Sequence, residues 1–213
     1  MKKNKIYIFL SFFFVISNFF AQNAYATYLE SGDNLSGYRI ERTATFLQIR
    51  AKEEHLRGVT FNNDGSKMYI IGTDSDAVHE FNLTTNFNVD SFTFSQSFSV
   101  SAQELIPTQV KFNKDGSKMF IVGEHTDQVE EYILTKSFDI STATHESSFF
   151  IGTQEARAYG LDFSTDGKNM YVSGLDGQAV HQYSLNVGFD LSAGVTFLRT
   201  ADLTTLRLSL IHI

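Results

Sequence analysis

The sequence predicts an all-β fold built from repeated four-stranded sheets, and three observations lead to this prediction. First, three segments align without a gap at their start and repeat every 51 residues. Second, an Asp-Gly pair separates two strand-like runs in each segment. Third, aromatic and β-branched residues are plentiful, and no window shows helical periodicity. Because about 50 residues in four strands make one β-propeller blade, we expect about three blades of an incomplete ring.

The repeat runs through most of each segment. The three copies begin GVTFNNDGSKMYIIG at Gly58, QVKFNKDGSKMFIVG at Gln109 and GLDFSTDGKNMYVSG at Gly160. Positions that match at this spacing include Phe61, Phe112 and Phe163; Gly72, Gly123 and Gly174; Val78, Val129 and Val180; Leu83, Leu134 and Leu185; and Phe87, Phe138 and Phe189. The matches predict blades over residues 58–108, 109–159 and 160–207.

The first copy shows how each blade divides into strands. We expect strands over residues 58–62, 67–73, 77–83 and 91–100. Between the first two stands Asp-Gly, a hairpin signal because glycine tolerates the positive φ of tight turns. In the last, apolar residues alternate, as they do in a half-buried strand. The pieces between strands are rich in Thr, Asn, Asp and Ser, which favour turns.

Residues 1–26 are interpreted as a signal peptide. Three lysines stand among the first five residues, and the apolar run over residues 6–20 is too short for a membrane span of about 20 residues. Small residues at Ala24 and Ala26 offer a cleavage site. A retained anchor is the alternative. We expect a secreted, periplasmic or cell-surface protein without a stable membrane span after signal removal.

Two further segments flank the blades. Residues 27–57 form an N-terminal segment, in which residues 38–49 align with the fourth strand of a blade. That strand would complete and close the last blade of a ring. At the other end, the repeat breaks off, and residues 208–213 are interpreted as a non-native tail; a genuine short apolar strand is the alternative.

Composition excludes some partners and chemistries. The signal peptide holds three of the 17 basic residues and none of the 24 acidic ones, so its removal changes the net charge from −7 to −10. Such a surface repels phosphate backbones, and we expect no nucleic-acid partner. The chain has no cysteine, so it has no thiol nucleophile, thiolate metal site or disulfide. Strand pairing and core packing must therefore stabilise it alone.

The motif Phe-x-x-Asp-Gly-x-Lys-Met-Tyr/Phe, followed by Ile/Val-x-Gly, resembles bacterial β-propeller repeats of the YVTN and lactonase-like type. Its last strand reads YIIG, FIVG and YVSG, and the third copy has Asn169 at the lysine position. The resemblance covers Gly58 to about Ala201 and implies a propeller fold, which WD40-like proteins share. Members of this type include enzymes, binding modules and surface proteins, so the resemblance assigns no catalytic residue here.

One charge repeats in the loops between blades. Glu53, Glu104 and Glu155 each stand eight residues before the first-strand phenylalanine, while their neighbours vary. One interpretation is that each carboxylate binds backbone N–H groups and fixes its loop. The other is an acidic ring that attracts a divalent cation or a cationic ligand. Strand order places the loops after the second strands on the same side, and these carry the further candidates Asp74, Asp76, Asp127 and Asp176.

Two histidines stand at equivalent positions in the third strands. They are His79 and His181, and Glu130 takes the same position in the middle blade. Packed sheets lie about 10 Å apart, whereas zinc–ligand bonds are about 2 Å, so the three cannot share a metal ion. We expect hydrogen bonding on or between blades, and no bound cofactor.

The sequence favours a module that binds an extracellular or periplasmic ligand or protein. An export signal and repeated loops on a rigid ring are typical of such modules, and the sequence contains no catalytic motif. We therefore lean against an enzyme. The first alternative is a lactonase-like hydrolase whose axial site lies mostly in blades absent from this sequence. The second is a structural or adhesion repeat of a surface protein.

Overall fold

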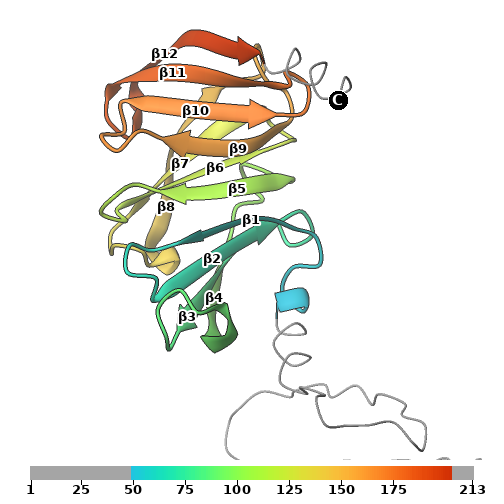
Figure 1. Cartoon of the computed structure of the whole chain (residues 1–213), viewed down its shortest axis with the longest axis vertical. Coiled ribbons are helices and arrows are strands. Elements are labelled where there is room, and N and C mark those ends of the chain that lie inside the picture. The colour runs from blue at the N-terminus through green and yellow to red at the C-terminus, as the bar shows by residue number, and fades with distance from the viewer. Residues whose placement is uncertain (1–48, 203–213) are drawn as a thin grey trace, which may run out of the picture. The chain divides into compact units, whose positions relative to one another are not determined.

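The computed structural model describes residues 49–202, and they form three four-stranded antiparallel sheets (Figure 1). We call these sheets blades 1, 2 and 3. Blade 1 holds β1 (Leu56–Phe61), β2 (Lys67–Gly72), β3 (Ala77–Leu83) and β4 (Phe92–Ser99); blade 2 holds β5 (Pro107–Phe112), β6 (Lys118–Gly123), β7 (Gln128–Leu134) and β8 (Ala143–Phe150); blade 3 holds β9 (Ala158–Phe163), β10 (Asn169–Gly174), β11 (Ala179–Val187) and β12 (Asp190–Asp202). Each sheet pairs its strands in chain order.

The predicted strands agree with these bounds to within two residues. The third strand of blade 1 has the predicted bounds, and the first begins at Leu56 instead of Gly58. The fourth strand was predicted to begin at Ser91, but that residue ends a short 3₁₀ helix, Val89–Ser91. The side chain of Asn88 caps this turn by accepting a hydrogen bond from the Asp90 N–H. Three residues are too few to leave a periodic signal in the sequence.

Successive blades stack through their inner strands. Strands β1, β5 and β9 contact one another in this order, and Figure 1 shows the three sheets one after the other. Aromatic rings pack between neighbouring sheets. The ring centroids of Tyr69 in blade 1 and Phe112 in blade 2 are 4.5 Å apart, and those of Phe120 in blade 2 and Phe163 in blade 3 are 4.6 Å apart. The residues that repeat every 51 positions therefore form the core between blades, as a β-propeller requires.

The Asp-Gly turns pack against the links between third and fourth strands. Gly65, Gly116 and Gly167 have φ angles of 71°, 73° and 70°. A Cβ on Gly65 would lie 2.3 Å from the ring of Phe87, and the Phe87 N–H donates to the Gly65 carbonyl at 2.9 Å. Phe87 itself has a φ of 58°. Close packing and a left-handed backbone thus both favour glycine in this turn.

Several predictions fall outside the described residues. These are the signal peptide, most of the strand expected over residues 38–49, and the tail. Ile49, the last residue of that strand prediction, lies instead in a helical turn, because its carbonyl accepts from the N–H groups of Lys52 and Glu53 at 2.9 Å. Among residues 49–202, no helix is long and apolar enough to cross a membrane.

Candidate functional site

The three repeated glutamates are buried. Glu53, Glu104 and Glu155 have exposed fractions of 2%, 0% and 1%. Each follows a single helical turn, in which its own N–H donates to the carbonyl four residues earlier. Glutamate is rarely fully buried in proteins unless its carboxylate has partners. The partners in this protein explain why the residue repeats.

In blade 1 the carboxylate joins two loops. Glu53 accepts from the N–H of His55 at 3.1 Å, within its own loop. It also accepts from the N–H groups of Asp74 and Ser75, at 3.1 and 3.3 Å, in the loop between β2 and β3. The Ser75 hydroxyl donates to the same carboxylate at 2.8 Å. We call this set, a buried glutamate and the loop groups it binds, the carboxylate clamp.

The clamp recurs in the other two blades. Glu104 accepts from Ile106 N–H at 2.8 Å, His125 N–H at 3.0 Å, Thr126 N–H at 3.1 Å and Thr126 Oγ1 at 2.8 Å. Glu155 accepts from Arg157 N–H at 3.1 Å, Asp176 N–H at 3.0 Å and Gly177 N–H at 2.9 Å. An ionised carboxylate only accepts hydrogen bonds, so several converging N–H groups suit it.

Each clamp also explains a repeated glycine at the end of the second strand. A Cβ on Gly72, Gly123 or Gly174 would lie 2.4, 2.5 or 2.4 Å from the Cδ atom of the clamp glutamate. No side chain fits at that distance without a shift of the carboxylate or the strand. The repeated glycine and the repeated glutamate are therefore two parts of one arrangement.

The structure does not bring the three glutamates together. Each carboxylate binds the loop amides of its own blade, and the described residues contain no group of three His, Cys, Asp or Glu side chains that could hold a metal ion. The geometry of the described residues thus fits the loop-fixing interpretation.

The four candidate aspartates have two kinds of surroundings. Asp74 and Asp176 form exposed ion pairs with His55 and Arg157, and these partners lower the pKa of both carboxyls. The hydrogen bond to Asp74 also raises the pKa of His55.

The other two aspartates shape the backbone. Asp76 and Asp127 have φ angles of 48° and 56°, and each main-chain carbonyl accepts, at 2.8 Å, from the residue that follows the fourth strand. The side chains of the four candidate aspartates do not meet in one site.

His79 connects a clamp to the fourth strand of its blade. Its Nε2 lies 2.9 Å from Ser75 Oγ and its Nδ1 lies 2.7 Å from Ser97 Oγ. Burial, with a smaller effect of the Lys52 charge, lowers the pKa of His79 to about 4. His181 in blade 3 pairs its Nδ1 with Thr200 Oγ1 at 3.0 Å, and burial lowers its pKa too. These hydrogen bonds lie within blades.

Glu130, at the equivalent position of blade 2, binds His145 Nε2 at 2.8 Å and Ser148 Oγ.

Sequence reasoning missed the link between His79 and the clamp through Ser75. The available signal was a hydroxyl residue 22 positions after each of the first two glutamates, Ser75 and Thr126.

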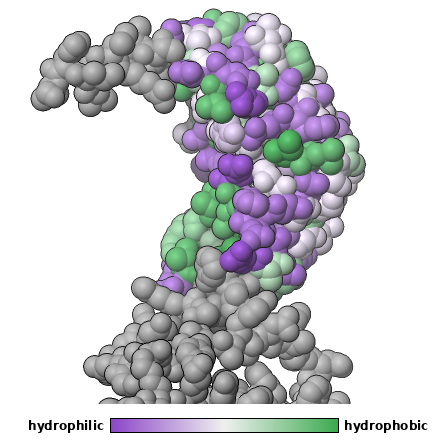
Figure 2. Space-filling model, turned by 90° about the vertical axis from the view of Figure 1, so that its right-hand side faces the viewer, coloured by the Kyte–Doolittle hydropathy of each residue, from purple (hydrophilic) through white to green (hydrophobic). Residues whose placement is uncertain are grey.

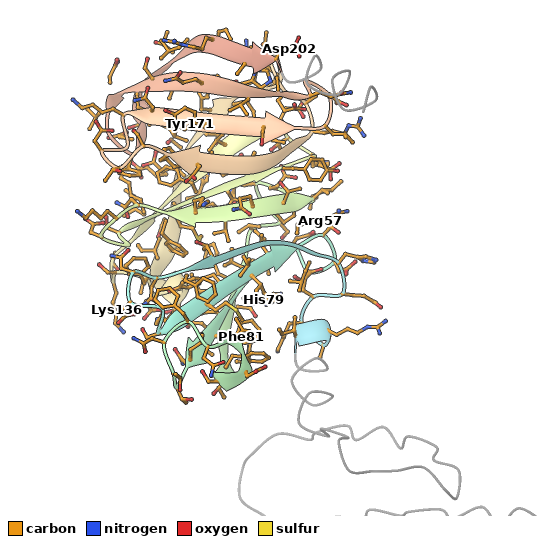
Figure 3. All side chains as sticks on the ribbon, in the orientation of Figure 1. Arg57, His79, Phe81, Lys136, Tyr171 and Asp202 are labelled. Carbon is orange, nitrogen blue, oxygen red and sulfur yellow. The ribbon has the colours of Figure 1, made fainter. Side chains whose placement is uncertain are left out.

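We call the side of the blades that carries the clamped loops the loop face; its described loops are residues 50–55, 73–76, 101–106, 124–127, 151–157 and 175–178. Figure 2 views this side and shows mostly hydrophilic residues with separate hydrophobic spots. Arg57, labelled in Figure 3, lies at its edge with its guanidinium 6.0 Å from the Tyr159 ring centroid. A hydrogen bond to Glu124 raises the pKa of Tyr159.

A cavity of about 250 Å³ lies beside this cluster, and it is lined by Gln109 and Lys111 of blade 2 together with residues of blade 3 that include Tyr159. Its lining includes Tyr171, Ser173 and Val180. Their equivalents in blade 2, Phe120, Val122 and Val129, are fully buried in the core shared with blade 3. These three lining residues thus stand at positions that pack between blades 2 and 3 one repeat earlier.

Comparisons with known proteins identify the fold alone. No protein-family model matches the sequence, and no curated protein matches it. Among solved structures, a candidate 6-phosphogluconolactonase from Bacteroides uniformis superposes with a TM-score of 0.52 at 16% identity, over 69% of this chain and 41% of that one. A candidate 6-phosphogluconolactonase from Bacteroides fragilis gives 0.51 at 18% identity, over 68% and 41%.

A protein from Lactobacillus plantarum gives a TM-score of 0.51 at 18% identity, over 70% of this chain and 41% of that one. This chain therefore spans about two fifths of the length of these structures. At such identities the likeness supports the propeller fold and carries no activity with it.

Proposed function

We propose that this chain is an exported β-propeller module that binds a ligand or protein through its loop face. One observation carries the proposal: a constant, buried clamp supports loops whose exposed side chains differ from blade to blade. Binding residues are often found on loops that a rigid scaffold positions.

The variable positions have different chemistries on the same backbone frame. Two residues after the clamp glutamate stand His55, Ile106 and Arg157. Four residues after it stand Arg57 in blade 1 and Tyr159 in blade 3, whereas the equivalent Thr108 of blade 2 is buried and donates to main-chain carbonyls. The residue after the clamp glycine is Thr73, Glu124 or Leu175. A purely structural repeat would not need different side chains at these positions. A surface that recognises one partner uses a different contact at each position.

A lactonase-like hydrolase is the second candidate. Two of the superposed structures are candidate 6-phosphogluconolactonases, and this is the observation that favours testing it. Among the described residues, the buried glutamates bind loop amides, and no residue is assigned a catalytic role. The aligned part of this chain covers about two fifths of those propellers, so the activity of a whole propeller remains a proposal for this chain.

The experiment is a residue-resolved NMR titration of the full chain with four probes: Ca²⁺, δ-gluconolactone, a lysine-rich peptide and a glutamate-rich peptide. We expect shift changes confined to the loop face with at least one probe. Replacing Arg57 with Ala and Tyr159 with Phe should weaken that binding, while Glu146→Gln on β8 should not. Turnover of the lactone would favour the hydrolase, and binding confined to the Asp-Gly turns on the opposite side would contradict the proposal.

A further inference from the structure

The hydroxyl of Ser75 in blade 1 lies between two buried groups. Its oxygen is 2.8 Å from Glu53 Oε2 and 2.9 Å from His79 Nε2. The hydroxyl donates to the carboxylate, so the imidazole Nε2–H donates to the hydroxyl oxygen. On the other side of the ring, the Ser97 hydroxyl then donates to Nδ1. Every polar atom in this chain of hydrogen bonds has a partner.

Blade 3 keeps both buried groups but lacks the hydroxyl. Glu155 and His181 stand where blade 1 has Glu53 and His79, and Gly177 stands where it has Ser75. A Cβ built on Gly177 would lie 2.7 Å from His181 Nε2 and 2.9 Å from Glu155 Oε2. The two polar atoms thus face the same point, as they do around Ser75.

His181 Nε2 makes this arrangement incomplete. The residue is 4% exposed, and its Nε2 is buried without a hydrogen-bond partner. It is the one such side-chain atom among residues 49–202. Leaving a buried polar atom unpaired costs about 1–3 kcal/mol, so a group that pairs with it is favoured.

We propose that blade 3 binds one small hydroxyl group, a water molecule or the hydroxyl of an alcohol, between Glu155 Oε2 and His181 Nε2. The guest takes the place that Ser75 Oγ has in blade 1. It donates to the carboxylate and accepts from the imidazole Nε2–H, while the Thr200 hydroxyl donates to Nδ1 across its 3.0 Å contact. This inference does not depend on the proposed binding function.

The chemistry of the site favours a neutral hydroxyl over an ion. An anion would be repelled by the Glu155 carboxylate. A metal cation would find only Glu155 and His181 as side-chain ligands of the usual types, because the described residues offer no third His, Cys, Asp or Glu there. A hydroxyl can donate and accept at once, which matches one acceptor-only carboxylate and one imidazole N–H.

Crystal structures of the full chain test the proposal directly. One crystal is grown in alcohol-free buffer and another is soaked in ethane-1,2-diol. We expect an electron-density peak at hydrogen-bond distance from both Glu155 Oε2 and His181 Nε2. A single-atom peak in both crystals identifies water as the guest, and elongated density after the soak identifies the alcohol. Absence of any peak in both crystals would overturn the proposal.

Two substitutions supply a second measurement. Gly177→Ser places a covalent hydroxyl at the site, and Gly177→Ala adds the same Cβ without it. Both side chains crowd His181 equally, so their difference isolates the hydroxyl. We expect the serine variant to melt about 2–4 °C above the alanine variant and to lose the guest density. Equal melting temperatures, with the guest density still present in the serine variant, would count against the site.

Discussion

The buried polar side chains of this protein act through specific partners. The clamp glutamates stood out in the sequence because a charged residue that repeats in otherwise variable loops is not expected by chance. The direction of each side chain could not be read from the sequence, because a loop carboxylate can bind inward to amides or outward to a cation. In each described blade, N–H groups of the loop between the second and third strands converge on the carboxylate, so the side chain points inward.

Burial of His79 predicts a pH dependence of stability. Its pKa is about 4 in the folded chain and near 6.5 in the unfolded chain, so the unfolded chain binds the proton first as the pH falls. The contribution is complete above pH 6.5 and is lost between pH 6.5 and 4, at up to about 3 kcal/mol. Urea titrations across this range should show the decline, and His79→Gln should flatten it. An unchanged slope in the variant would contradict this assignment.

Removing one clamp carboxylate should destabilise the fold. Glu104→Gln replaces an acceptor-only group with an amide whose NH₂ faces loop N–H donors, and we expect a loss of about 2–3 kcal/mol in the free energy of unfolding. The matched control is Glu146→Gln on β8, an exposed carboxylate, which should change stability by less than about 0.5 kcal/mol. Chemical denaturation measures both; equal effects would refute the clamp.

Within a blade, strand order and turns follow from local sequence. The Asp-Gly pair predicted the hairpin between first and second strands, and alternation predicted the fourth strand to within one residue at each end. The links between third and fourth strands were harder. Phe87, Phe138 and Phe189 repeat as though they were core residues, yet they adopt φ angles of 57–58° and pack over the turn glycines. No propensity rule assigns a left-handed backbone to phenylalanine.

The glycine that ends each second strand should tolerate no side chain. In Gly123→Ala the new Cβ would lie 2.5 Å from the Cδ atom of Glu104, so the clamp must open or the strand must shift. We expect a loss of about 1–3 kcal/mol. In the double variant Gly123→Ala, Glu104→Ala, the alanine should cost much less, because its obstacle is gone. A strictly additive loss, measured by denaturation, would show that the contact is not the cause.

Between blades, the sequence predicted the apolar contacts but not the polar ones. Tyr69 Oη and Lys67 Nζ both donate to the Phe138 carbonyl of the next blade, at 2.7 and 2.9 Å. Glu131 accepts from the Leu191 N–H at 2.8 Å, also across a blade boundary. Such contacts join residues about 60–70 positions apart, so a repeat of 51 gives no sign of them.

The polar pair in the middle of each blade differs along the chain. Lys67 and Glu80 in blade 1 and Lys118 and Glu131 in blade 2 form ion pairs. Blade 3 has a neutral pair instead, in which Gln182 Nε2 donates to Asn169 Oδ1 at 2.8 Å. Each charged pair also contacts the following blade, through Lys67 Nζ to the Phe138 carbonyl and through the Leu191 N–H to Glu131.

A double-mutant cycle tests this pair in blade 2. Lys118→Asn alone leaves the buried Glu131 carboxylate without its cation and should cost about 2–3 kcal/mol. Glu131→Gln alone leaves the partly exposed Lys118 ammonium with Asp190 at 3.9 Å and should cost less. Together they install the neutral pair of blade 3, and we expect the double variant to recover most of that loss. Denaturant unfolding of the four proteins gives the coupling energy. A coupling near zero would mean that the two side chains act independently.

A buried carboxylate fixes the loop face in each of the three described blades. Residue-resolved amide hydrogen exchange tests it most directly, because it reports on each donated N–H separately. We expect the amides of Ser75, Thr126 and Gly177 to exchange as slowly as those of the neighbouring strands. Of these three, only the Thr126 amide should exchange faster in Glu104→Gln, together with the other amides that Glu104 binds. Fast, loop-like exchange of all three amides in the unmodified chain would contradict the claim.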